Sequence, residues 1–382
     1  MKNLIIISLV CLFISCNSGK KSTPIEQANS YIIDNLTISD TTYSSIKNIL
    51  KLDEYIILDK DVPLANINRV IVTEKQIFIF DSQPKIVCYN LEGKVEFKIS
   101  NKGRGVGEFL KIVDFSLDNN SQTIKVYDSS LRKILYFDSK NGTFKYDRKI
   151  SIAPHAIAHF GNYDYYYNPY SFNYPNSEEY HYSLIKSKGE KEFVGKYFSH
   201  DPIISKYMFG NSGEFPFFYG NKELLFVKRF DKTIYSISDD GISSLFEINL
   251  PNPVSESYMQ NKPKPMALIE SQFSSGLTDI YRTDNVLYFA FTNSGNFIST
   301  FYDLSRNIVI YCGIRIWPKP SKELPVYYPI RGVFENKFFA LINSSTIVEL
   351  RKNNESVFPE GMLKVDEIDN PVIAFYSVKN ER

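Results

Sequence analysis

The chain has 382 residues, of which 43% are hydrophobic and 15% aromatic, and its 44 Lys and Arg balance 43 Asp and Glu. The apolar content excludes a wholly disordered chain, the charge balance argues against nucleic-acid binding through a broad basic face, and 4 cysteines are too few for a disulfide scaffold. The length suits two domains or one large closed β structure.

The first fifteen residues have the features of a signal for export. Lys2 precedes an apolar run that extends from Leu4 to Ile14. This run is shorter than the roughly 20 residues of a membrane span and is typical of a signal peptide. It ends at Ser15 and Cys16, which resembles a bacterial lipobox, where the thiol takes a diacylglycerol. We predict a lipoprotein signal peptide over residues 1–15 and lipidation of Cys16; the alternative is a plain secretory signal with a chance cysteine.

Residues 16–40 are expected to form the lipidated cysteine and a flexible tether, because the first residues after Cys16 are small and polar without apolar periodicity. More than one acyl chain would hold the protein stably on a membrane. Lipoproteins with Asp after the cysteine tend to stay in the inner membrane. Asn17 stands there in this chain, so the resemblance favours the outer membrane of the cell envelope and leaves the leaflet open.

Short strands separated by turns dominate the rest of the chain. Segments rich in β-branched and aromatic residues are separated by turn residues, as expected for strands. These strand-like segments recur along the chain at 77–81, 85–90, 94–99, 124–128, 133–138, 143–150, 286–291 and 337–342. Turn glycines at Gly93, Gly142, Gly189 and Gly241 are 49, 47 and 52 residues apart. An insert without clear periodicity spans residues 251–276.

A period of 40–50 residues with four strands in each repeat is typical of a β-propeller. We therefore predict an all-β fold, with residues 41–382 forming a single six-bladed β-propeller of four-stranded antiparallel blades. Such a ring closes by pairing strands from both chain ends, and 55–58 and 371–378 are the two unassigned strands that we place in one blade. Short helices are expected at 44–50 and 344–354.

Five phrases in this order resemble the bacterial six-bladed β-propeller lipoproteins, with repeats of the NHL or TolB-like type. They are EYIILD, NKGRGVGEF, FDKTIYSISDDG, TDNVLYFAF and DNPVIAFYSVK, at 54–59, 101–109, 230–241, 283–291 and 369–379. Val106 stands where this family often carries Pro. The resemblance implies a six-bladed ring and a lipid anchor. It implies no established reaction and no catalytic residues.

The glycine-rich segment 101–109 is interpreted as a turn between blades. A dinucleotide fingerprint would need a strand before it and a helix after it, and here a strand follows. Lys102 and Arg104 within this segment are candidates for contacting an anion on one rim of the ring.

No set of metal ligands is predicted. His155 and His159 are four residues apart and would share one face of a strand, so a metal site there stays open. Asp81, Asp128 and Asp138 follow apolar strands, where turn hydrogen bonding is the default. An axial Ca²⁺ site, as in propeller enzymes of the lactonase type, is the alternative. The remaining thiols, at 88 and 312, are expected to be small buried side chains that form no disulfide.

The tyrosine-rich stretch YDYYYNPYSFNYP at 163–175 is the most unusual part of the sequence. Packing inside and between blades is the default for these rings, but the two prolines mark loops that would place some rings on a rim. Exposed aromatic rings beside Asn and Asp suit sugars and peptides. Tyr170, Phe172 and Tyr174 are the candidate ligand-facing group.

Two classes of function remain for the sequence. The first is a lipid-anchored binding or scaffold protein of the cell envelope, with a glycan, a peptide or another envelope protein as partner. The second is a propeller hydrolase or lyase with a metal on the axis. The absence of a recognisable catalytic motif favours the first, although fold alone does not decide function.

Overall fold

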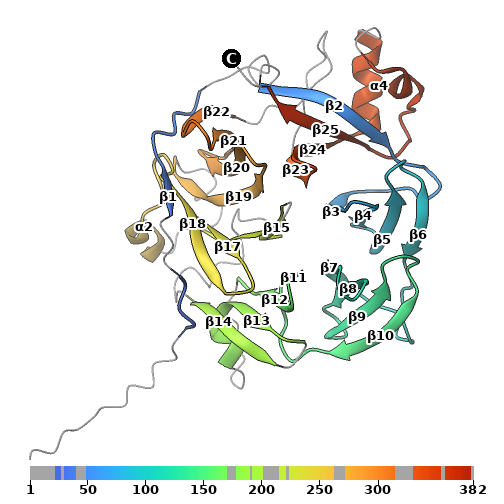
Figure 1. Cartoon of the computed structure of the whole chain (residues 1–382), viewed down its shortest axis with the longest axis horizontal. Helices are drawn as coiled ribbons and strands as arrows, with labels where there is room; N and C mark the ends of the chain where they lie inside the picture. Colours follow the sequence, from blue (N-terminus) through green and yellow to red (C-terminus); the bar gives the residue numbers. More distant parts are fainter. Residues whose placement is uncertain are drawn as a thin grey trace, which may run out of the picture.

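The computed structural model describes residues 22–26, 30–39, 49–169, 178–189, 192–200, 215–220, 223–261, 272–314, 330–353 and 358–379. Its strands form six sheets arranged around one axis, so that the chain is a six-bladed β-propeller (Figure 1). Each blade is built on four antiparallel strands, as the repeat period predicts. No helix in the described part of the chain is long and apolar enough to cross a membrane.

The first three blades follow one another along the chain, and each begins with its innermost strand. Blade one contains β3 (Ile67–Val72), β4 (Gln76–Asp81), β5 (Lys85–Asn90) and β6 (Val95–Ile99). Blade two contains β7 (Ile112–Asp118), β8 (Thr123–Asp128), β9 (Lys133–Asp138) and β10 (Phe144–Lys149). Blade three contains β11 (Ala156–Phe160), β12 (Tyr163–Tyr167), β13 (Tyr182–Ser187) and β14 (Phe193–Ser199).

Blades four to six continue the same order, with additions from the N-terminal part of the chain. Blade four contains β15 (Phe217–Tyr219), β16 (Leu224–Val227), β17 (Thr233–Ile237) and β18 (Ile242–Ile248), with β1 (Tyr31–Ile33) at its outer edge. Blade five contains β19 (Ser274–Arg282), β20 (Val286–Asn293), β21 (Asn296–Asp303) and β22 (Ile308–Ile314). Blade six contains β23 (Ile330–Phe334), β24 (Lys337–Ile342), β25 (Val372–Val378) and β2 (Leu50–Ile57).

The ring closes in blade six, where β2 pairs antiparallel with β25 over its whole length, from Leu50 opposite Val378 to Ile57 opposite Val372. The predicted closure by strands from both chain ends is therefore confirmed. Asn370, which is 3% exposed, also joins the two ends. Its amide nitrogen donates to the carbonyl oxygens of Asp59 and Val62, and its amide oxygen accepts from the N–H of Leu64 at 2.8 Å.

The helices in the described residues are short and lie in connections between strands. The prediction of a helix at 344–354 is confirmed by α4 (Ser344–Asn353), between β24 and β25. The helix expected at 44–50 falls mostly outside the described residues, and β2 begins at Leu50. The other helical segments are η1 (Glu178–His181), α2 (Glu256–Gln260) and η4 (Glu360–Lys364).

Apolar side chains on both faces of the blades fill the spaces between neighbouring sheets. In β4, Ile77 and Ile79 pack with blade six, whereas Phe78 and Phe80 pack with blade two. Successive side chains of a strand point to opposite faces, so an uninterrupted apolar strand can serve two interfaces. Each of the six apolar clusters lies between two adjacent blades.

The N-terminal segment follows the outer edges of three blades before it enters β2. The N–H of Thr23 donates to the carbonyl of Lys196 in blade three, and β1 runs parallel to β18 in blade four. Ser39 then bridges to Gly313 in blade five. The tether is expected over 16–40, and the described part of that range, 22–26 and 30–39, pairs with exposed sheet edges. Such backbone pairing needs no apolar periodicity.

The aspartates at strand ends have the predicted role in turns. The Asp81 carboxylate accepts from the N–H groups of Ala65 and Gln83, and Asp128 accepts from four N–H groups in the matching connections of blade two. Gly93 and Gly142 close equivalent turns with φ of 81° and 70°, which glycine adopts without strain. These repeated features position the starts of the innermost strands.

Candidate functional site

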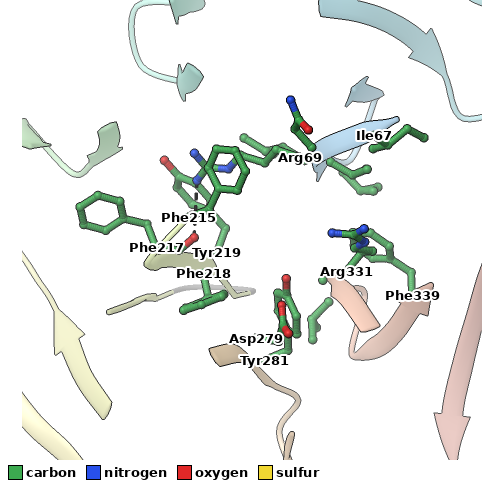
Figure 2. Close-up of a pocket in the computed structure, with 16 residues that line it drawn as sticks. Ile67, Arg69, Phe215, Phe217, Phe218, Tyr219, Asp279, Tyr281, Arg331 and Phe339 are labelled. Carbon is green, nitrogen blue, oxygen red and sulfur yellow. Dashed lines mark hydrogen bonds between the residues drawn. The ribbon is translucent and has the colours of Figure 1, made fainter. Parts of the chain in front are cut away.

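A cavity of about 340 Å³ lies at the axis of the ring, bounded by the innermost strands of blades one, four, five and six (Figure 2). β3 forms one wall and β15, β19 and β23 form the others. Its walls combine aromatic rings with a few polar side chains, chiefly Asn68, Arg69, Tyr219, Asp279, Tyr281 and Arg331. A cavity of this size and composition is typical of a small-molecule site.

A buried ion pair borders this cavity and ties four blades together. Arg69 of β3 is 7% exposed and lies 2.5 Å from the carboxylate of the fully buried Asp114 of β7. Asp114 also accepts from the N–H of Ile157 in β11, and Arg69 donates to the carbonyl of Phe217 in β15. Burial raises the pKa of Asp114, while Arg69 and two N–H donors act in the opposite direction.

Irregular strand pairing brings the other polar side chains to the cavity. The pairing register shifts between Ile67 and Arg69 in β3 and between Ile330 and Gly332 in β23, so Asn68 and Arg331 occupy the extra positions. Such irregularities redirect a side chain relative to a regular strand. Asp279 lies at a third irregularity, in β19, with φ of 45°.

Arg331 differs from Arg69 because it lacks a partner in the described part of the chain. Its Nε atom is buried and has no hydrogen-bond partner, and no described carboxylate forms an ion pair with its guanidinium. In Figure 2 the Arg331 side chain points from β23 toward the open space that Tyr281 faces from β19. The two arginines of this cavity therefore differ: Asp114 neutralises Arg69, whereas no described carboxylate forms an ion pair with Arg331.

Two tyrosines supply hydroxyl groups to the cavity. Burial raises the pKa of Tyr219 to about 12 and that of Tyr281 still further, so both stay protonated at neutral pH. The Tyr219 hydroxyl oxygen accepts from the N–H of His159 at 3.2 Å, which leaves its proton available. Tyr281 lines the same cavity from β19.

A second cavity of about 500 Å³ adjoins the first, since Asn68 and Phe215 line both. Lys111, Arg132 and His155 also line this outer cavity, and none of its lining residues is an aspartate or glutamate. The carboxylate of Asp128 accepts from the N–H of Lys111, so the basic residues of this cavity lie close to an acidic group.

A buried charged cluster lies between blades two and three. Lys125 of β8 is 2.6 Å from Asp164 and 3.4 Å from Asp118, and His159 of β11 contacts the same two carboxylates at 2.7 and 3.4 Å. Burial opposes protonation of His159, but hydrogen bonds to Asp118 and Asp164 outweigh it and raise its pKa. Burial likewise opposes ionisation of Asp118, yet His159 and Ser121 lower its pKa. Lys125 and His159 thus pair with both carboxylates inside the protein.

The structure separates the two histidines that could have shared a metal. His155 precedes β11 and lines the outer cavity, whereas His159 lies near the other end of that strand, within the charged cluster. Among the described residues no three His, Cys, Asp or Glu side chains are arranged to hold a metal ion. Cys88 and Cys312 are buried and free in blades one and five, as predicted.

Of the residues predicted to contact a ligand, the two basic ones lie in the described part of the chain and the three aromatic ones do not. Lys102 and Arg104 are exposed in the connection between β6 and β7 and are absent from the walls of both axial cavities. Tyr170, Phe172 and Tyr174 lie outside the described residues, as does Cys16. The described part of the tyrosine-rich stretch forms β12, where Tyr165 and two neighbouring tyrosines are buried between blades.

Sequence reasoning missed Asn68, Arg69, Asp114 and Arg331 as site residues. The available signal was a polar residue inside an apolar innermost strand, as in INRVIV at 67–72 and IVDFSLD at 112–118. Buried charges in such positions require partners. A polar residue in an innermost strand thus indicates a position near the axis, but it does not indicate whether that residue has a partner.

Comparisons with known proteins agree with the fold. One similar structure is that of a "putative exported protein" from Bacteroides fragilis, with a TM-score of 0.74 at 16% identity, covering 92% of this chain and 99% of that one. A member of the DUF4221 family from Bacteroides vulgatus is similar with a TM-score of 0.54 at 13% identity, covering 87% and 99%. No curated protein matches the sequence. The model of a domain of unknown function, DUF4934, matches residues 54–377, and the chain therefore belongs to the DUF4934 family.

Proposed function

We propose that this protein is an exported, lipid-anchored β-propeller of the cell envelope, which binds a small ligand in the two adjoining axial cavities. Export is supported by the signal-like residues 1–15 and by the name of the similar Bacteroides fragilis protein. Anchoring on the outer membrane is supported by Cys16 and Asn17. Binding is supported by the geometry of the axis.

The observation that carries the proposal is the contrast between satisfied and unsatisfied polar groups at the axis. Arg69 and Asp114 neutralise each other, and Lys125 and His159 pair with the two carboxylates between blades two and three. The buried Nε atom of Arg331 has no hydrogen-bond partner among the described residues, and Arg331 and Tyr281 face a cavity of ligand size. Buried polar groups are usually paired, so an unpaired group that borders a cavity points to a ligand.

Replacing Asn68 with Trp is expected to abolish ligand binding, because this side chain lines both cavities and an indole would obstruct their junction. The test is thermal unfolding of the full chain in detergent with a panel of amino acids, monosaccharides, nucleosides and small carboxylates. A bound ligand at 100 times its Kd adds about 2.7 kcal/mol, which raises the Tm of wild type but not of Asn68→Trp. Asn101→Trp is the control, since Asn101 is exposed outside both cavities. Stabilisation that survives in Asn68→Trp, or no stabilisation by any class, would refute the cavity assignment.

Replacing Cys16 with Ala is expected to remove lipid labelling and to release the protein from membranes, because the thiol is the predicted acyl acceptor. Metabolic labelling with an alkyne fatty acid, followed by membrane fractionation, measures both effects. Cys11→Ala is the matched control, since Cys11 lies inside the predicted signal peptide. Equal labelling of wild type and Cys16→Ala would show that the anchor is elsewhere or absent.

A further inference from the structure

Arg331 carries a positive charge that the described protein groups do not neutralise. Its Nε atom is buried without a hydrogen-bond partner, and its guanidinium faces the axial cavity (Figure 2). Leaving the buried Nε donor of a charged group without a partner costs free energy, so a ligand that pairs with this guanidinium is favoured. A planar guanidinium also matches the two oxygens of a carboxylate in a bidentate geometry.

The neighbouring cavity groups donate hydrogen bonds to the same space. Tyr281 lines this cavity, and the Tyr219 hydroxyl oxygen accepts from the N–H of His159, which leaves the Tyr219 proton available. Both hydroxyls stay protonated at neutral pH. A guanidinium with two hydroxyl donors suits a ligand group that has negative charge and several acceptor positions.

The outer cavity adjoins the inner cavity at Asn68 and Phe215, and Lys111 is among its lining residues.

The inner cavity limits the charge and the size of the ligand. Of its two arginines, Arg69 is paired with Asp114, so one negative charge on the ligand can pair with Arg331. The volume of about 340 Å³ restricts the ligand to a small molecule. Phe215, Phe218 and Tyr219 offer ring surfaces for an apolar or cyclic body.

We infer that the ligand is a small organic monocarboxylate with a ring or an apolar body, whose carboxylate pairs with Arg331. This inference rests on the proposed binding function and names the ligand class of the same site. Arg69 does not take this role, because Asp114 already satisfies it.

The test titrates benzoate, phenylacetate and glucuronate, with benzamide and glucose as uncharged counterparts, into the full chain in detergent. Calorimetry and thermal unfolding follow wild type, Arg331→Gln and Arg331→Lys. At least one carboxylate is expected to bind wild type at least tenfold more tightly than its uncharged counterpart. Arg331→Gln is expected to weaken it at least tenfold and Arg331→Lys to weaken it less, because lysine keeps the charge but loses the planar fork. Arg104→Gln, an exposed arginine outside both cavities, is the matched control and should bind like wild type.

A structural role for Arg331 makes a different prediction for the protein without ligand. If Arg331 is reserved for a ligand, the Tm of Arg331→Gln equals or exceeds that of wild type, because an unpaired charge is removed. Three results would overturn the inference: a lower Tm of Arg331→Gln without ligand, equal carboxylate binding by wild type and Arg331→Gln, or no binding of any carboxylate. A fourth result is that wild type binds only benzamide or glucose and that Asn68→Trp does not bind it. That result would overturn the carboxylate assignment but would leave the proposed binding function intact.

Discussion

Replacing Asp114 with Ala is expected to lower the free energy of unfolding by about 3–5 kcal/mol. The substitution leaves the Arg69 guanidinium buried without its carboxylate and the N–H of Ile157 without its acceptor. Because these contacts join blades one, two and three at the axis, we expect the whole ring to lose stability rather than one blade. Chemical denaturation followed by the circular dichroism of the strands measures the change.

Two further variants make this prediction specific. Asp114→Asn keeps an acceptor for Ile157 without the negative charge and should lose an intermediate amount, which guards against an alanine variant that fails to fold. Glu54→Ala breaks an exposed ion pair, at 2.6 Å from Lys337, and should cost at most about 1 kcal/mol. Equal and small losses for Asp114→Ala and Glu54→Ala would contradict the axial role of the buried pair.

Joining β2 to β25 by a disulfide is expected to trap the closed ring and to raise the free energy of unfolding by about 2–4 kcal/mol. Lys51 and Ser377 face each other across this pair, and Lys51 is exposed. A disulfide between Lys51→Cys and Ser377→Cys therefore holds the two chain ends together in the unfolded state. This constraint lowers the conformational entropy of the unfolded state. Denaturation with and without reductant measures the gain.

The species that form on oxidation distinguish closure of blade six within one chain from pairing of β2 and β25 between two molecules. A closed ring gives a monomer that migrates faster without reductant, and each single-cysteine variant serves as a control. The native Cys88 and Cys312 are buried and should not compete. If the two introduced cysteines linked only different molecules, blade six would not close within one chain, and the closure described above would be wrong.

The fold was largely predictable because its determinants are local and repeated. The segments at 85–90 and 133–138 were expected as strands and coincide with β5 and β9. Their apolar residues serve interfaces on both faces, and the turns after them contain Gly93 and Gly142. The closing strand β25 was found because it remained unassigned after the repeats were counted.

The site was not predictable to the same degree, since it depends on irregular pairing and on contacts distant in sequence. Arg331 reaches the cavity from a register shift in β23 that no composition rule reveals. Asp114 finds Arg69 through ring geometry, 45 residues away. The docking of Thr23 on blade three depends on a free sheet edge, which is likewise invisible in the segment itself.

Calorimetric titration of the most stabilising compound into wild type and Asn68→Trp tests the central claim most directly. The account predicts one site per chain in wild type and at least a tenfold loss of affinity in Asn68→Trp, because the added indole obstructs the junction of the two axial cavities. Equal affinity in the two proteins would contradict the account and would place the binding surface away from the axis, with the exposed connection around Lys102 and Arg104 as the next region to test.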